Sequence, residues 1–178
     1  MNSRDDMALR VDTSDTQAVF VRMLDAPAAR VFHCWTRARE FTRWFGPREF
    51  SSPVCEIDTR HGGRWYIVQR SPEGVDYPLT GIYTRLEPTR RLACKVSSAE
   101  YPADWHATLC RLGGGASGAA SDQMTWDVAF DEAGDRTRIA VTTFFATTAE
   151  RDAHLRMGIV RGWEETLQRL NQRLCADD

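Results

Sequence analysis

The sequence has little that would suit it to a membrane, a nucleic acid or secretion. Its 178 residues carry 23 basic and 25 acidic side chains, so a net charge of −2 offers a nucleic acid no strongly basic face. No apolar run approaches the roughly 20 residues that a membrane-spanning helix needs. The opening MNSRDDMALR lacks the basic segment and apolar stretch of a signal peptide. We expect a soluble, cytoplasmic protein with no membrane span and no nucleic-acid partner.

Cysteine and histidine are too scattered to indicate a metal centre or a familiar catalytic motif. The five cysteines include no C-x-x-C pair, and no histidine lies at zinc-ligand spacing from one of them. The four histidines form neither H-E-x-x-H nor H-x-H, and neither G-x-S-x-G nor a glycine-rich phosphate loop occurs. We therefore expect reduced thiols, no metal and no cofactor.

The patterns that are present alternate between strand and helix. Residues 1–15 are polar, and we expect them to be disordered or frayed. Alternating side chains in 17–24 predict the first strand. Asp25 and Pro27 then end this strand and begin a helix, because proline is tolerated where a helix starts and an acidic side chain favours its positive end.

The segment EFTRWFGPREF predicts the end of a second short helix. Phe41, Trp44 and Phe45 repeat at helical spacing, and Gly46 followed by Pro47 is typical of a helix that ends in the left-handed conformation. Such a cluster either fills a core or walls a pocket. We assign Phe41 and Phe45 mainly to packing, and we expect Trp44 at the pocket wall.

Six further strand patterns follow, separated by turn residues. Residues 98–123 interrupt them, and a Gly/Ala/Ser-rich run at about 112–121 predicts a flexible loop inside a long hairpin connection. The six predicted strands are 53–59, 64–70, 79–86, 91–97, 124–130 and 137–146.

One long helix is predicted from Thr147 onward, over roughly 28 residues. Thr147 and Glu150 have capping-box spacing, and apolar side chains recur at three- and four-residue steps after them. Gly158 and Gly162 are costly inside a helix, so either a backbone, a ring or a ligand comes close to them or the helix simply tolerates them. Together these elements predict an α+β fold in which a twisted antiparallel sheet wraps around a helix and leaves an apolar cavity.

Six motifs occur in a definite order along the chain. They are DAPAARVFHCWT, EFTRWFGP, RHGGRWYI, GIYTRLEPTRRL, H-x7-GW from His154 to Trp163, and LQRLNQRL. Together they resemble the START-like SRPBCC superfamily, with its Bet v 1-like helix-grip fold. Within it, the chain is similar to the branch of the C-terminal domain of the activator of the heat-shock-protein-90 ATPase.

The resemblance covers about 16–175 and implies a single domain. It implies a seven-stranded curved antiparallel sheet wrapped around a long C-terminal helix, with two short helices between strands 1 and 2. The glycine-rich run at 112–121 departs from the family pattern, so the rim of the cavity is the part least defined by the resemblance.

Aromatic side chains are the strongest candidates for a binding site, because tryptophan and tyrosine combine a large apolar face with a polar tip that can orient a ligand. His154 is a candidate proton donor or hydrogen-bond partner for a ligand, since imidazole titrates near neutral pH. Packing in the core is the alternative role for the aromatic residues. The candidate ligand-binding residues are Trp44, Trp65, Tyr83, Trp126 and Trp163.

Three functions stay open at this point. We favour non-enzymatic binding of a small hydrophobic molecule of lipid, aromatic or polyketide-like type. The second is an enzyme of the cyclase, aromatase or hydrolase kind, in which a cavity histidine or acid transfers a proton. The third, implied by the resemblance, is a chaperone-associated protein-interaction module. A homodimer is also open.

Overall fold

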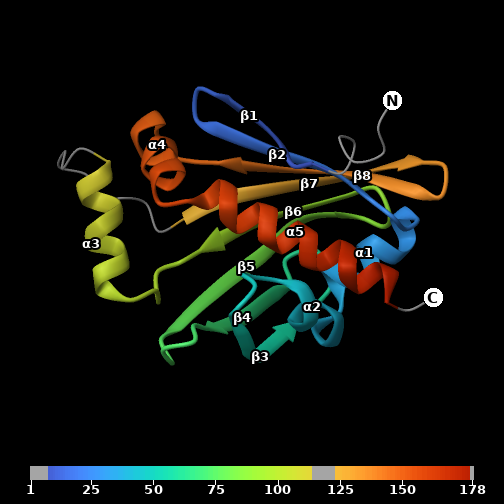
Figure 1. Ribbon diagram of the computed structural model, residues 1–178, viewed down its shortest axis with the longest axis horizontal. Helices are drawn as coiled ribbons and strands as arrows, with labels where there is room; N and C mark the ends of the chain where they lie inside the picture. The colour runs from blue at the N-terminus through green and yellow to red at the C-terminus, as the bar shows by residue number, and fades with distance from the viewer. Residues whose placement is uncertain (1–7, 114–122, 177–178) are drawn as a thin grey trace.

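The computed structural model describes residues 8–113 and 123–176, and these form eight strands and five helices in an α+β arrangement (Figure 1). Within the described residues, no helix combines the length and apolarity needed to cross a membrane. Along the chain the elements are β1 (Arg10–Ser14), β2 (Gln17–Leu24), α1 (Ala28–Thr36), α2 (Ala38–Trp44), β3 (Ser51–Ile57), β4 (Arg64–Arg70), β5 (Asp76–Glu87), β6 (Arg91–Ser97), α3 (Ala103–Leu112), β7 (Gln123–Ala133), β8 (Arg136–Phe144), α4 (Thr148–Arg156) and α5 (Ile159–Cys175).

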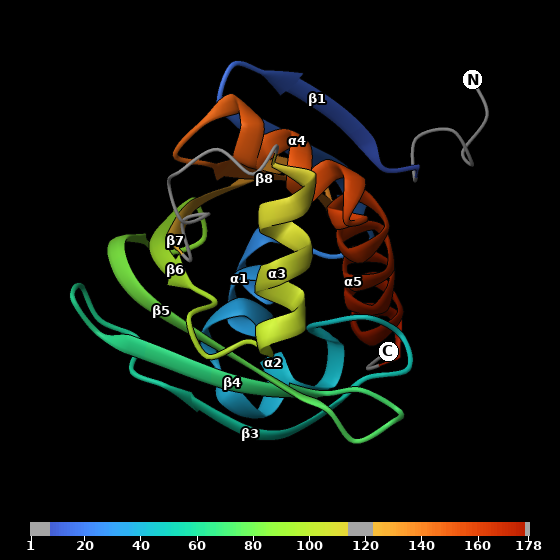
Figure 2. The ribbon, with the colours of Figure 1, turned by 90° about the vertical axis from the view of Figure 1, so that its left-hand side faces the viewer.

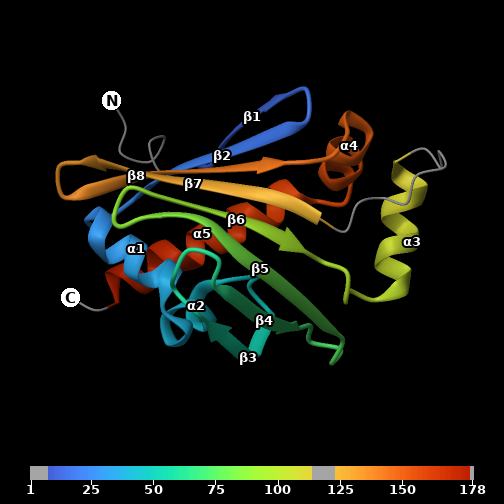
Figure 3. The same cartoon turned by 180° about the vertical axis from the view of Figure 1, so that it is seen from behind.

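All strands pair antiparallel in one sheet, in the order β1-β2-β8-β7-β6-β5-β4-β3. The alternation of side chains fixes the register: Phe20 lies opposite Val141, Val141 lies opposite Val128, and all three are fully buried on one face. A slip of one residue would turn these side chains to the other face. The sheet curves around α5, with α1 and α2 beside the C-terminal half of that helix (Figures 1 and 3).

The sheet has eight strands, so the expectation of seven is corrected. The additional strand is β1, Arg10–Ser14, which lies in the segment that we expected to be frayed. It pairs with β2 through a tight hairpin in which Ser14 lies opposite Gln17. All five of its side chains are exposed, so backbone hydrogen bonds hold the strand and no apolar alternation marks it in the sequence.

The predicted long C-terminal helix is two helices, α4 and α5. Gly158 separates them with φ +91°, a left-handed conformation that glycine adopts without a steric cost. The apolar repeat continues across this break, which is why the pattern suggested a single helix. The expected cap of α4 is confirmed: the Thr147 hydroxyl accepts the Glu150 N–H at 3.1 Å, and the Glu150 carboxylate accepts the Ala146 N–H at 3.0 Å.

A helix also replaces part of the expected long loop at 98–123. Residues Ala103–Leu112 form α3, which packs against α4 and crosses the open end between the sheet and α5 (Figure 2). The sequence did not predict α3, because Leu109 is its only fully buried residue and a Gly/Ala/Ser-rich run follows it directly. Residues 114–122, which hold most of the predicted flexible loop, lie outside the described residues, as do 1–7.

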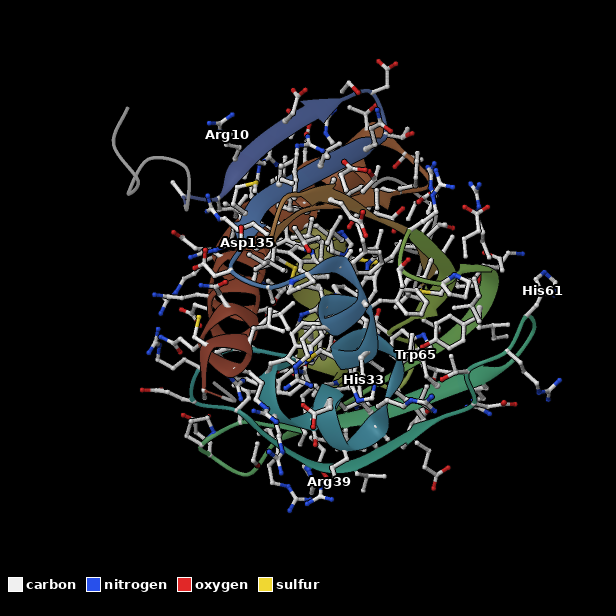
Figure 4. All side chains as sticks on the ribbon, turned by 90° about the vertical axis from the view of Figure 1, so that its right-hand side faces the viewer. Arg10, His33, Arg39, His61, Trp65 and Asp135 are labelled. Atoms are coloured by element: carbon white, nitrogen blue, oxygen red, sulfur yellow. The ribbon has the colours of Figure 1, made fainter. Side chains whose placement is uncertain are left out.

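An aromatic cluster forms the core where α1 and α2 meet the sheet. Trp35 and Trp44 are 5.0 Å apart between ring centroids, and Phe41 stacks on Phe45 at 4.4 Å. Trp65 on β4 points into this interior, whereas His61 projects away from the body of the molecule (Figure 4). The aromatic cluster noted in the sequence is therefore mostly core.

Candidate functional site

A cavity of about 250 Å³ lies where α5 faces the sheet. The sheet, the N-terminal half of α5, the Phe45-Gly46-Pro47 segment and the turn into α3 all contribute to it. Among the described residues that line it, none is Asp, Glu, Lys or Arg. The lining residues are Phe45, Gly46, Pro47, Gln69, Leu79, Ser98, Tyr101, Trp105, Met124, Trp126, His154, Met157, Gly158, Ile159, Gly162, Trp163 and Thr166.

The two glycines of the C-terminal segment open the helix side of this cavity. A Cβ atom built on Gly158 or on Gly162 would meet nothing within 4 Å. Of the alternatives that the sequence left open, a close ring or backbone among the described residues is therefore excluded, and both glycines line the cavity. Trp163, the next residue on α5, is 5% exposed and closes the inner end with Trp126, their ring centroids 5.2 Å apart.

His154 is the one ionisable nitrogen base in the described lining. It belongs to the last turn of α4 and is 4% exposed, and its Nδ1 lies 3.0 Å from the Glu150 carbonyl oxygen. Its other ring nitrogen, Nε2, is buried without a hydrogen-bond partner in the described structure. Burial lowers the pKa of His154, although the contact with Glu150 opposes this shift. The imidazole is consequently neutral at neutral pH.

Two more buried polar atoms of lining residues have no hydrogen-bond partner in the described part of the chain. They are Nε2 of Gln69 on β4 and Nε1 of Trp126 on β7. The end of the Gln69 side chain lies against Gly46, whose φ of +101° is a left-handed conformation that favours glycine. Buried polar groups usually have partners, and such exceptions frequently mark the place of a ligand or water.

Polar bonds from α5 hold the helix against the elements that form one cavity wall. Arg169 donates to the carbonyl oxygens of Gly46 and Pro47 at 3.0 and 2.8 Å. At the other side of the helix, the Asn171 side-chain oxygen accepts the Asp25 N–H at 2.8 Å, and its amide donates to the Asp25 carboxylate at 3.0 Å. The wall is thus fixed by long-range bonds that no local sequence pattern indicates.

The structure divides the predicted site residues into three groups. Trp126, Trp163 and His154 line the cavity. Trp65 and Tyr83 line a separate void of about 10 Å³, which Trp126 also borders.

Trp44 lies in neither place. It is fully buried in the core, and its Nε1 donates to the Cys34 carbonyl oxygen at 3.0 Å. Phe45, assigned mainly to packing, is the aromatic residue of that segment that reaches the cavity. Sequence reasoning also missed Tyr101 and Trp105, because they belong to the segment that was expected to be a loop.

A curved antiparallel sheet that holds a long helix over an apolar cavity defines the helix-grip class of proteins. The chain belongs to the family described as Activator of Hsp90 ATPase homolog 1-like protein, whose pattern its residues 25–174 match. The resemblance drawn from the six motifs is therefore confirmed. No curated protein matches the chain.

Solved structures share this fold over nearly the whole chain. A protein from Nitrosomonas europaea is 25% identical, with a TM-score of 0.74 over 91% of this chain and 96% of that one. A protein from Silicibacter pomeroyi described as AHSA1 is 18% identical, with a TM-score of 0.69 over 91% and 99% of the two chains. An AHSA1-like protein from Aeromonas hydrophila is 18% identical, with a TM-score of 0.62 over 89% and 93%.

Proposed function

We propose that this protein binds a small, uncharged, largely apolar molecule in the cavity between α5 and the sheet. The observation that carries the proposal is the cavity of about 250 Å³, lined by apolar and aromatic side chains and by glycines that leave its helix side open. Ligand sites are commonly concave, mostly apolar and supplied with a few placed polar groups. The cavity fits this description, with a volume just below the usual size range.

The size and chemistry of the cavity narrow the class of ligand. Typical sites for small molecules begin at roughly 300 Å³, so a molecule of one or two fused rings suits a space of about 250 Å³. Aromatic rings of Phe45, Trp126 and Trp163 favour planar apolar partners. No charged side chain is available in the described lining to pair with a ligand charge, and an unpaired charge is expensive to bury.

Binding without turnover has more support than acid–base catalysis. A cyclase or hydrolase needs groups that give and take protons at the reacting atoms. The described lining contains His154 and the phenol Tyr101 but no carboxylate that could orient or pair with the imidazole. His154 therefore serves better as a hydrogen-bonding group than as half of a catalytic pair.

Native mass spectrometry of freshly purified protein is the direct test of occupancy. The expected result is an added mass that corresponds to a small neutral molecule and disappears on denaturation. A mass equal to that of the chain alone, together with failure of all small aromatic probes to bind, would contradict the proposal.

Filling the cavity from α5 should prevent binding. We expect Gly162→Leu to weaken the binding of 2-methoxynaphthalene at least about tenfold in isothermal titration calorimetry, because the new side chain enters space that no protein atom occupies. Gly162→Ala is the matched control: alanine and leucine have similar helix propensities, and alanine adds only one carbon. Equal binding by the wild type and the folded leucine variant would place the ligand elsewhere.

A further inference from the structure

We propose that the molecule bound in this cavity is a neutral hydrogen-bond donor, whose O–H or N–H group reaches Nε2 of His154. The proposal rests on the binding function proposed above and adds the recognition chemistry to it. An apolar alcohol, a phenol or a neutral aromatic compound with a ring N–H has this chemistry. A pure hydrocarbon or an ether of the same shape lacks it.

The hydrogen bond of His154 within α4 determines which ring nitrogen is the acceptor. A backbone carbonyl oxygen can only accept, so Nδ1, at 3.0 Å from the Glu150 oxygen, must carry the proton. A neutral imidazole carries one N–H, and Nε2 is then a bare acceptor. Burial, which lowers the pKa of His154, supports the neutral form.

The surroundings of the imidazole leave this acceptor without a hydrogen-bond partner among the described residues. The Phe145 ring lies 4.9 Å from the imidazole and the Trp105 ring lies 5.9 Å from it, measured between centroids. These aromatic neighbours hold the imidazole in place, and in the described structure neither they nor any other group donates a hydrogen bond to Nε2. The other two unpartnered lining atoms, on Gln69 and Trp126, belong to donor groups. Of the three unpartnered atoms, Nε2 of His154 is therefore the one that can accept a hydrogen bond from a ligand.

Burial makes this acceptor selective. Nε2 is buried and has no hydrogen-bond partner in the described structure, so an apolar ligand without a donor leaves it unpaired. A ligand with its own donor supplies the missing hydrogen bond. The preference therefore comes from a hydrogen bond that only the donor ligand makes.

The test compares 2-naphthol with its methyl ether, 2-methoxynaphthalene, which keeps the rings and the oxygen but has no donor. By isothermal titration calorimetry, the wild type should bind 2-naphthol about tenfold more tightly, a difference of about 1.4 kcal/mol. His154→Phe keeps a ring of similar shape without an acceptor, so the preference should fall to about twofold or less. The ratio of the two probe affinities is compared between the wild type and His154→Phe. This comparison cancels the difference in size and hydrophobicity between the probes.

Two outcomes separate this inference from the binding function. Suppose that the wild type binds both probes with equal affinity and that Gly162→Leu prevents the binding of both. This result would overturn the inference that the ligand donates a hydrogen bond to His154, and it would leave cavity binding intact. Binding of neither probe would overturn the binding function and the inference with it.

A second measurement needs no variant. The ¹⁵N resonance of His154 Nε2 should move on addition of 2-naphthol in the direction expected for an acceptor that gains a hydrogen bond, and it should move less with the ether. An Nε2 resonance that already shows attached hydrogen in the free protein would overturn the assignment of the acceptor.

Discussion

At the scale of single residues, the sequence made His154 a candidate for the cavity but could not assign its chemistry. Its position in the predicted first turns of a C-terminal helix follows from the Thr147 cap, which the structure confirms. The state of its two nitrogens depends on the Glu150 carbonyl and on the Phe145 and Trp105 rings. The Trp105 contact is long-range, so only the folded chain defines it.

The stability of the protein should depend on pH through His154. Burial lowers its pKa in the folded state, so below about pH 6.5 the unfolded chain binds a proton that the folded chain excludes. The free energy of unfolding should therefore fall as the pH is lowered through this region, by at most about 1.4 kcal/mol per pH unit from this one group. Above it, the contribution of His154 is constant.

Urea denaturation of the wild type and of His154→Phe between about pH 8 and about pH 5 measures this contribution. All other titrating groups are common to the two proteins, so their difference isolates His154. We expect the wild type to lose stability relative to the variant on acidification. Parallel curves over the whole range would show that His154 is not held neutral.

The choice between Trp44 and Phe45 shows a limit of reading residues from a sequence. Both are large, both are apolar, and they are adjacent at the end of α2. Which one reaches the cavity depends on the exact residue at which the helix ends and on φ +101° at Gly46. Helix ends are uncertain by one or two residues in any such reading, and that is enough to exchange the two roles.

At the scale of elements, the helices and strands with clear periodicity were predictable. Three strands, 17–24, 64–70 and 91–97, have the predicted bounds. The elements that escaped prediction, β1 and α3, bury few side chains of their own and depend on neighbours. Periodicity reports burial, so an element that buries little leaves a weak signal.

The two glycines of the C-terminal segment should respond oppositely to alanine. Gly158→Ala forces a left-handed conformation on a residue with a Cβ and should lower the free energy of unfolding by about 1 to 2 kcal/mol. Gly162→Ala lies inside α5 with open space around the new Cβ, and should raise it by about 0.5 to 1 kcal/mol.

Chemical denaturation with a common slope measures both changes, and each variant serves as the control for the other. Destabilisation by both substitutions would mean that the segment is one continuous helix packed against other groups on this side. Stabilisation by both substitutions would contradict the left-handed break at Gly158.

At the scale of the whole molecule, the cavity exists because the sheet is curved and α5 is held away from part of its inner face. The sheet wraps around α5, while α3 crosses the open end (Figure 2). Bonds from Arg169 and Asn171 fix α5 to the α2–β3 connection and to the end of β2. The sequence predicted the class of fold from the order of its elements, but the volume of the cavity depends on these distant bonds and on two glycines.

A molecule with such a space should be stabilised when the space is filled. With 2-naphthol at about 100 times its dissociation constant, mass action adds about 2.7 kcal/mol to the stability of the folded state. For a chain of this size, that corresponds to a rise in Tm of about 5 to 10 °C, measurable by differential scanning calorimetry.

Gly162→Leu provides the control for this shift. Its Tm without ligand should be at or above that of the wild type, and it should change little when 2-naphthol is added. A ligand-dependent rise of equal size in both proteins would show that the probe stabilises the fold from outside the cavity.

The order of the sheet, with β1 and β3 as its outer strands, bears on how the protein behaves when it is concentrated. An outer strand presents unpaired backbone groups to which a second chain could add a strand. Here β1 is only five residues long, and β3 contains Pro53, which has no N–H, within a shift of register between Ser51 and Val54. Both edges are therefore poor templates for a strand from a neighbouring molecule. Association of two copies by strand pairing at these edges is therefore disfavoured.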